Sequence, residues 1–284
     1  MPRPVPPESD ISQLRAIYEL EKGLADRLRH AEPASREALY SEVYDEYFRS
    51  LPPEAAPHPS DEQTRLQLEL LAPFISSDSV LLEIGSGDGT FAKAIAPNIR
   101  QVWAVDASDF VADSGGAQTP GNCIHVLPDQ LEERVDAGAV DVAFSCHFLE
   151  HLHPNDLNRH MNQVLRALKP GRPYLMVTPN RLHGPHDISG YFSDYPEGFH
   201  LREYTHYELG HEALNSGFGR VRALWGLPGV AVDRPLWLTR LVETVLDLLG
   251  TRIRQHLFHR LLAHKAPFRP LEQVVLAAWK PLDT

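Results

Sequence analysis

The spacing of apolar and polar residues divides the chain into a helical N-terminal part and a longer part in which strands and helices alternate. Apolar residues recur at helical spacing through 11–50, and Pro33 divides this segment into two expected helices. A segment with four prolines follows at 51–60, and a third helix is expected at about 61–73. From Val80 onwards, short apolar runs alternate with amphipathic segments, which predicts a mostly parallel sheet with helices on both faces.

The alternating part predicts seven strands, the last of which is expected to enter the sheet antiparallel. Helices are expected at 155–168 and 205–216, and two further amphipathic helices at 235–264 form an insertion before the last strand. The expected strands are 80–84, 101–106, 123–127, 140–145, 172–178, 221–225 and 274–279.

Three glycines follow the strand at 80–84 at every second position: Gly85, Gly87 and Gly89. Glycine allows backbone angles closed to other residues and lets the backbone approach a ligand closely, and the helix expected from Thr90 offers free N–H groups. Gly87-x-Gly89-x-x-Ala92 also satisfies the relaxed dinucleotide-binding pattern. Glu83 at the strand end would repel a pyrophosphate, so the charge argues against a dinucleotide.

Three segments carry a resemblance to a known family. LEIGSGDG at 82–89 resembles the first motif of the class I S-adenosylmethionine (SAM) methyltransferases. VDVAFSCHFLEHL at 140–152 and LKPGRPYLMVT at 168–178 resemble segments of the small-molecule methyltransferases in that family. The resemblance covers about 80–225 and the final strand, and the ammonium group of SAM suits Glu83.

The resemblance implies a Rossmann-like methyltransferase fold, an α/β fold with a doubly wound, seven-stranded, mostly parallel sheet. The methyltransferase domain is expected at 75–284. The resemblance does not explain the helical insertion at 235–264 or residues 1–74, which are expected to be a tail and a helical lid. Tyr40, Tyr44 and Tyr47 share one face of the second helix, where they either pack in a core or interface or cover the cofactor or substrate.

The expected cofactor site lies around the carboxyl ends of the first four strands. Asp106 ends the second strand, where a carboxylate can accept hydrogen bonds from both ribose hydroxyls. The resemblance further implies that Asp129, or else Gln130, meets the adenine amino group, and that Ser145 and Cys146 lie beside the cofactor through their backbone. The expected cofactor-binding residues are Glu83, Gly85, Ser86, Gly87, Gly89, Asp106, Ala107, Asp129, Gln130, Ser145 and Cys146.

Fifteen histidines raise the question of a metal or a general base. His147 and His151 are four residues apart, and Asp156 or His200 offers a third ligand, but nothing in the spacing requires one, so no metal is expected. A hydroxyl acceptor benefits from a general base, and histidine titrates near neutral pH. The expected catalytic residues are His151 and His200, although His151 is equally suited to a structural hydrogen bond, and an amine acceptor needs no base.

Composition narrows the choice of partners. The net charge of −11 argues against a nucleic-acid substrate, although Arg and His residues gather at 252–269, on what we expect to be a solvated helix face. The Pro-rich start has no apolar signal core and no apolar run spans a bilayer, so a cytoplasmic location without stable membrane insertion is expected. Cys123 and Cys146 fall in expected strands and form no disulfide framework.

The sequence therefore predicts a SAM-dependent methyltransferase acting on a small-molecule, sugar or lipid-linked acceptor, with oxygen as the expected methylated atom. The insertion at 235–264 either covers the substrate or forms a homodimer interface. Two alternatives remain: a non-catalytic SAM-binding or scaffold protein, and a nicotinamide-dependent oxidoreductase, which would have no use for Glu83.

Overall fold

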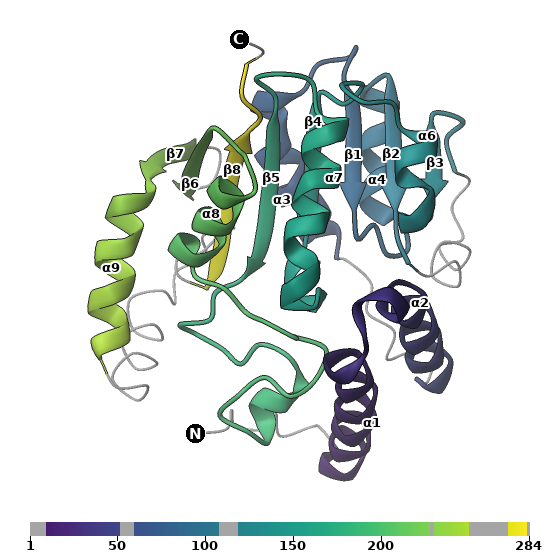
Figure 1. Cartoon of the computed structure of the whole chain (residues 1–284), viewed down its shortest axis with the longest axis vertical. Coiled ribbons are helices and arrows are strands. Elements are labelled where there is room, and N and C mark those ends of the chain that lie inside the picture. The colour runs from purple at the N-terminus through teal and green to yellow at the C-terminus, as the bar shows by residue number, and fades with distance from the viewer. Residues whose placement is uncertain (1–9, 52–59, 108–118, 228–229, 250–271, 283–284) are drawn as a thin grey trace.

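The computed structural model describes residues 10–51, 60–107, 119–227, 230–249 and 272–282. One sheet runs through the molecule with helices on both faces, and α1 and α2 lie below it in the view of Figure 1. Three helices precede the sheet: α1 (Ile11–His30), α2 (Pro33–Ser50) and α3 (Asp61–Leu71). Asp10 and Ser60 cap α1 and α3 with their side chains, and α2 begins at Pro33, which loses no hydrogen bond there. The expected helical N-terminal part is present.

The sheet has eight strands in the order β3-β2-β1-β4-β5-β8-β6-β7. β1 to β5 pair in parallel, whereas β8 pairs antiparallel with β5 and β6, and β7 pairs antiparallel with β6. The doubly wound, mostly parallel sheet is confirmed, but it has one strand more than the seven predicted, because β7 forms an unexpected hairpin with β6. The strands are β1 (Val80–Ile84), β2 (Gln101–Val105), β3 (Cys123–Val126), β4 (Val142–Cys146), β5 (Pro173–Pro179), β6 (Arg220–Leu227), β7 (Val230–Pro235) and β8 (Gln273–Trp279).

Two hydrophobic cores lie on the two faces of the sheet. Successive strand residues face opposite sides, so β1 gives Leu82 to one core and Leu81 to the other. Met161 of α7 packs in the first core, and Phe91 of α4 packs in the second. The helices that flank the sheet are α4 (Thr90–Ile95), α6 (Leu131–Arg134), α7 (Leu157–Ala167), α8 (His206–Asn215) and α9 (Leu236–Leu248). This rigid framework fixes the carboxyl ends of β1 to β4.

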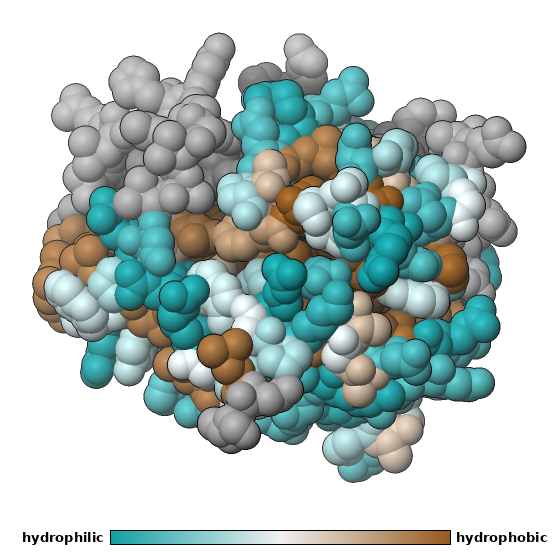
Figure 2. All heavy atoms as spheres, turned by 90° about the horizontal axis from the view of Figure 1, so that it is seen from above, coloured by the Kyte–Doolittle hydropathy of each residue, from teal (hydrophilic) through white to brown (hydrophobic). Residues whose placement is uncertain are grey.

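Helix α9 is the first of the two helices predicted in the insertion; the second, with the basic cluster at 252–269, lies outside the described residues. Helix α9 packs its Leu246 against Leu182, and its Glu243 accepts hydrogen bonds from His206 in α8. Figure 2 shows hydrophobic side chains at the left of the molecule, where Figure 1 places α9. The exposed apolar residues of α9 are Trp237, Leu241, Val245 and Leu248. Among the described helices, none combines the length and apolar character that a bilayer span requires.

Candidate active site

The turn after β1 has the backbone geometry that its glycines predict. Gly85, Gly87 and Gly89 have φ values of +71°, +52° and +70°, which side-chain-bearing residues rarely adopt. A Cβ on Gly85 would lie 2.7 Å from Cδ2 of Phe148, whereas one on Gly87 would point into open space. The N–H of Gly85 donates to the Val105 carbonyl at 2.8 Å, which fastens the turn to β2. The turn thus presents bare backbone toward a ligand.

A cavity of about 270 Å³ opens beside this turn. The carboxyl ends of four neighbouring parallel strands meet there, which is where open α/β sheets bind ligands. Asp106 and Ala107 reach it from β2, Pro128 and Leu131 from the segment after β3, and His147 from the end of β4. Helix α7 forms one wall with Arg159, His160 and Gln163, together with Asp156, the residue directly before the helix. Segments far apart in the sequence thus contribute to one site.

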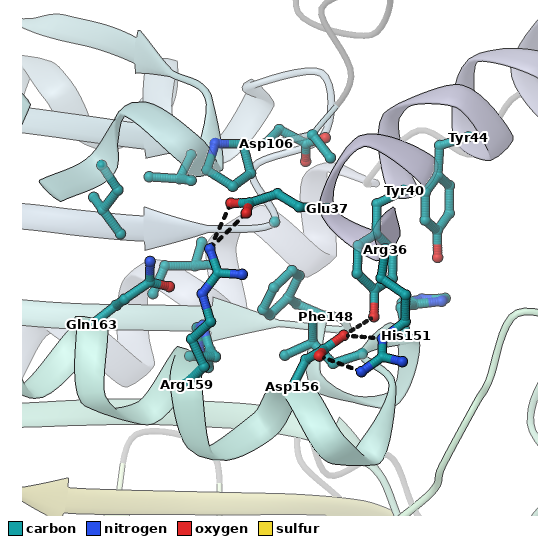
Figure 3. A pocket seen from close by; sticks show the side chains of 18 of the residues that line it. Arg36, Glu37, Tyr40, Tyr44, Asp106, Phe148, His151, Asp156, Arg159 and Gln163 are labelled. Atoms are coloured by element: carbon teal, nitrogen blue, oxygen red, sulfur yellow. Dashed lines mark hydrogen bonds and ion pairs between the residues drawn. The ribbon is translucent and has the colours of Figure 1, made fainter. Parts of the chain in front are cut away.

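Helix α2 covers the cavity and is fastened to α7 by two ion pairs (Figure 3). The Arg36 guanidinium donates to both oxygens of Asp156, at 2.8 and 2.7 Å, and only 3% of the Arg36 side chain is exposed. Tyr40 donates to Asp156 at 3.1 Å, and Arg159 pairs with Glu37 at 2.7 Å. A buried bidentate pair fixes both distance and orientation. Helix α2 is therefore held over the ligand space.

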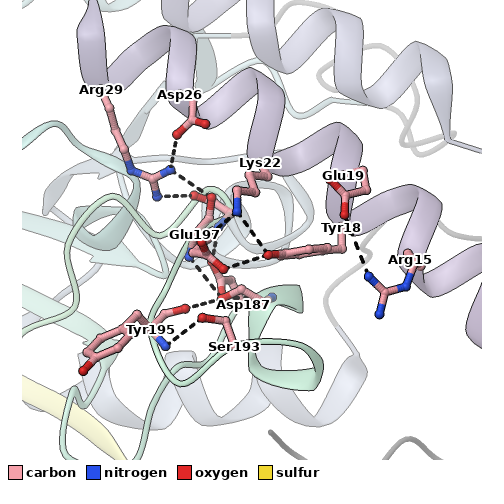
Figure 4. Close-up of polar contacts among 12 residues, drawn as sticks. Arg15, Tyr18, Glu19, Lys22, Asp26, Arg29, Asp187, Ser193, Tyr195 and Glu197 are labelled. Atoms are coloured by element: carbon pink, nitrogen blue, oxygen red, sulfur yellow. Dashed lines mark hydrogen bonds and ion pairs between the residues drawn. The ribbon is translucent and has the colours of Figure 1, made fainter.

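Helix α1 is fastened to a different part of the chain, the long segment between β5 and α8 (Figure 4). Arg29 donates to the backbone carbonyls of Glu197 and Gly198 at 2.9 and 2.8 Å. The Glu197 carboxylate accepts from Lys22 at 2.8 Å and from Tyr18 at 2.7 Å. These bonds hold the backbone just before Phe199 and His200, next to the predicted catalytic residues.

Carboxylates gather beneath the glycine turn. Asp106 accepts from the Gly87 N–H at 2.8 Å and lines the cavity. Glu83 is buried, and its Oε2 has no hydrogen-bond partner among the residues that the structure describes. Burial first, and then the nearby Asp106 and Asp88, raise the pKa of Glu83 well above its usual value. A cationic group would satisfy both the free oxygen and the negative charge.

His151 lines the cavity and is held in one tautomer. Its Nδ1 lies 3.1 Å from the Phe199 carbonyl, which can only accept, so Nδ1 carries the proton. Burial lowers the pKa of His151 to about 4, so the ring is neutral at pH 7 and Nε2 keeps a free lone pair. The ring also meets His200 edge to face, with centroids 5.1 Å apart.

Buried charges surround this histidine pair. His200 and Glu203 are hydrogen-bonded at 2.7 Å between Nδ1 and Oε1, and both are buried. The Glu150 carboxylate, which is fully buried, accepts from Thr178 at 2.8 Å. Although burial opposes its ionisation, the hydrogen bond with His147 and the electrostatic effect of the neighbouring histidines His151 and His200 hold the pKa of Glu150 at about 2. Buried ionisable side chains are therefore concentrated behind the part of the cavity wall that His147 and His151 form.

Comparison with known proteins decides the family. The family model described as "Methyltransferase domain" matches residues 59–222, more than half of the chain. The chain belongs to the methyltransferase domain family. The predicted family, enzyme class and cofactor are thereby confirmed: this is a SAM-dependent methyltransferase. A search of curated proteins found no match.

Solved structures agree on the fold of this methyltransferase. Phosphoethanolamine N-methyltransferase 1 of Haemonchus contortus, in complex with phosphoethanolamine and S-adenosylhomocysteine, has a TM-score of 0.57 at 13% identity over 89% of this chain and 50% of that chain. Phosphoethanolamine N-methyltransferase 2 of Haemonchus contortus, in complex with SAM, has a TM-score of 0.53 at 18% identity. The match covers 91% of this chain and 60% of that chain. The [4+2]-cyclase SpnF has a TM-score of 0.54 at 17% identity, and the match covers 87% of this chain and 97% of that chain. The methyltransferase thus spans about half the length of the Haemonchus enzymes.

The residues under the turn fit SAM. The unpaired, buried Oε2 of Glu83 and the open space at Gly87 match a ligand that brings an ammonium group to bare backbone. Ser86 adds a second buried side-chain oxygen without a hydrogen-bond partner in the described structure. These observations support the methionine end of the cofactor at the turn.

The structure brings together some of the predicted site residues and separates others. Gly85, Gly87, Asp106, Ala107 and His151 line the cavity. The other predicted residues do not line it. Glu83, Ser86 and Gly89 lie within or beneath the turn, and His200 lies behind His151. Asp129 and Gln130 are exposed, although Pro128 and Leu131 on either side of them line the cavity. Ser145 and Cys146 turn their side chains away, Ser145 to the Tyr174 hydroxyl at 2.8 Å and Cys146 into the second core. Their assigned roles stay predictions.

Several residues of the site were not anticipated in these roles. Arg36, Glu37 and Arg159 line the cavity as ion-paired side chains, yet each resembles an ordinary helix-surface charge in the sequence. His147 has a φ of +54°, an uncommon value for a residue with a side chain, and it too lines the cavity. Glu150 precedes His151 in the LEHL segment, and this position next to a predicted catalytic residue is the one sequence feature that could have indicated Glu150 as part of the site.

Proposed function

We propose that this methyltransferase transfers a methyl group to a hydroxyl oxygen of a small-molecule, sugar or lipid-linked acceptor. The observation that carries the proposal is the geometry of His151, which faces the same cavity as the glycine turn and keeps Nε2 free to accept a proton. When bound, SAM supplies an activated methyl group for in-line displacement, which requires the acceptor atom at about 3 Å.

His151 would accept the hydroxyl proton as the new bond forms. A neutral imidazole with a low pKa is a weak base, but the acceptor oxygen becomes strongly acidic as it gains the methyl group. Glu150, whose charge raises the pKa of His151 against the effect of burial, would stabilise the imidazolium that results. His200 would then act through His151, since the two rings are in contact and His200 is absent from the cavity wall.

Helix α2 supports the proposed role of the N-terminal segment as a lid. It covers the cavity with Tyr40, Tyr44 and Phe48, and its Ser41 hydroxyl donates to the Ala107 carbonyl at 2.6 Å. Excluding water favours methyl transfer to the acceptor over loss of the methyl group to solvent. Ion pairs join α2 to the α7 side of the cavity, whereas its Val43 packs with α1 and Phe199 in a hydrophobic cluster separate from the two cores of the sheet. Opening of α2 would therefore leave the sheet folded.

The exposed stripe of α9 supports a homodimer interface rather than a substrate cover. Figure 1 places α9 at the opposite end of the sheet from α2, and no residue of α9 lines the cavity. Its stripe consists of Trp237, Leu241, Val245 and Leu248. Sedimentation of the wild-type chain and of Leu241→Glu would test this: we expect a dimer that the substitution dissociates, and a wild-type monomer would refute it.

The alternatives can be separated by binding and transfer assays. Calorimetric titration with S-adenosylhomocysteine and, in parallel, with NADH should show binding of the first alone. Methyl transfer from labelled SAM to hydroxylated acceptors then distinguishes an enzyme from a SAM-binding scaffold. This second assay is essential, since SpnF, described as a [4+2]-cyclase, shares the fold, and fold does not set the reaction. Methylation of amine acceptors only, unchanged in His151→Ala, would refute the oxygen target and the base.

A further inference from the structure

The side chains of Glu150, His151 and His200 converge where His151 forms part of the cavity wall. Each offers a ligand atom, and these atoms all lie within 4.8 Å of one another. From the sequence no metal is expected, because the spacing of His147 and His151 leaves the third ligand open. The fold supplies it: His200, distant in the sequence, is brought against His151. We propose that these three residues bind a divalent transition-metal cation.

The second ring nitrogens of the two histidines are already held as they are in metal sites. His151 donates Nδ1–H to the Phe199 carbonyl at 3.1 Å, and Nδ1 of His200 lies 2.7 Å from Oε1 of the buried Glu203. Metal-binding histidines almost always donate their other N–H to a carboxylate or a backbone carbonyl, which fixes the ring and makes the remaining nitrogen a better ligand. In both rings, Nε2 is left for the cation.

The carboxylate member is held in the same manner. Glu150 accepts from Thr178 at 2.8 Å, and its other oxygen lies 3.3 Å from Nδ1 of His147, so both oxygens are oriented while each keeps a further lone pair. Glu203 is in turn fixed by the backbone N–H of His186 at 2.7 Å. A set of preoriented partners around three convergent ligands is expected of a site rather than of an accidental cluster.

The donor set indicates the class of cation. Two imidazoles and one carboxylate suit Mn²⁺, Fe²⁺, Co²⁺ or Zn²⁺ and leave coordination positions open, whereas Mg²⁺ and Ca²⁺ prefer oxygen ligands. His151 and His147 line the cavity, so the cation has a route of entry. This inference rests on the proposed methyl transfer only for its role in the reaction: without a cation, Nε2 of His151 is the base described above. With a cation bound, Nε2 would be a ligand, an open coordination position would hold the acceptor oxygen, and the hydroxyl proton would leave to water.

The test uses Co²⁺ as a spectroscopic probe on the 284-residue chain, without an affinity tag, SAM or acceptor. We expect each chain to bind one Co²⁺, with the visible absorption bands typical of Co²⁺ held by nitrogen and oxygen ligands. Added Zn²⁺ should displace the Co²⁺ and remove these bands. His200→Gln should abolish the signal, and Glu150→Gln should weaken it. His211→Ala is the matched control, since His211 is an exposed histidine on α8 and should change nothing.

Outcomes that overturn the inference are equally specific. Undiminished Co²⁺ binding in His200→Gln would put the metal elsewhere. Absence of Co²⁺ binding from a wild-type protein that binds S-adenosylhomocysteine would show that the cluster is only a hydrogen-bonded network. If both ligand variants fail to fold, Glu203→Gln decides, because it removes no ligand and should weaken metal binding about 10- to 100-fold. Metal binding without methyl transfer would refute the proposed function and leave this inference standing.

Discussion

Removing the Arg36 side chain tests whether α2 is a lid. In Arg36→Ala, Asp156 loses both charge-assisted hydrogen bonds and keeps only that from Tyr40. Breaking a buried ion pair costs about 3–5 kcal/mol. Because 21% of the Asp156 side chain is exposed and water can replace Arg36 there, we expect a cost at or below the bottom of that range, about 2–3 kcal/mol. Since 1.4 kcal/mol corresponds to a factor of ten, the population of the state with α2 open should increase about 30- to 150-fold.

Dissociation of S-adenosylhomocysteine, followed by stopped-flow fluorescence, should accelerate by about that factor if opening of α2 precedes release. Amide hydrogen exchange in α2 should accelerate in parallel, while exchange in β4 should stay unchanged, because the sheet core is not touched. The matched control is Arg27→Ala. Arg27 joins α1 to α2 through Glu46 at 2.6 Å, but that pair is largely exposed and worth about 0–1 kcal/mol.

Three outcomes would refute the reasoning. Unchanged dissociation in Arg36→Ala would mean that the cofactor leaves without movement of α2. An equal effect of Arg27→Ala would mean that the hairpin of α1 and α2 acts through general stability rather than through the contact with α7. Faster exchange throughout β4 would mean global destabilisation. The variant Asp156→Asn adds an internal check, since it removes the same ion pair from the other side.

Three further predictions concern the glycine turn. Gly85→Ala should abolish binding of S-adenosylhomocysteine in calorimetry and lower Tm, because its Cβ would clash with Phe148 at a strained φ. Asp106→Ala should weaken SAM binding by about 1–3 kcal/mol, and undiminished affinity would contradict the ribose role. Burial, Asp106 and Asp88 raise the pKa of Glu83, so at pH values below that raised pKa the free protein holds a proton that the cofactor ammonium should expel. Affinity should therefore rise with pH through that raised pKa, and a persistent rise in Glu83→Gln would exclude Glu83 as its source.

The parts of the fold that could be predicted are those encoded locally. The apolar run at Val80, the three glycines and the helix after them are contiguous, and each local preference agrees with the next. The extra strand β7 was missed because Val230–Pro235 ends in proline and follows Pro228 closely in the sequence, which together give a weak strand pattern.

The site was less predictable because its decisive contacts join distant residues. Arg36 and Asp156 are 120 positions apart, and nothing around either indicates the other. His151 is oriented by the backbone carbonyl of Phe199, and every residue has such a carbonyl, so no sequence pattern could indicate it. Glu83 and Asp106 were accessible to prediction since each ends a strand whose position the sheet topology fixes.

The bonds between α1 and the carbonyls of Glu197 and Gly198 have a kinetic consequence. They join the N-terminal hairpin to the backbone that carries Phe199 and His200, and Phe199 also stacks on Tyr44 of α2 at 4.8 Å. One movement of the hairpin would then uncover the cofactor end and the acceptor end of the cavity together. Turnover would pass through a single shared opening step, so both products should leave at the same rate, and solvent viscosity should slow the two releases equally.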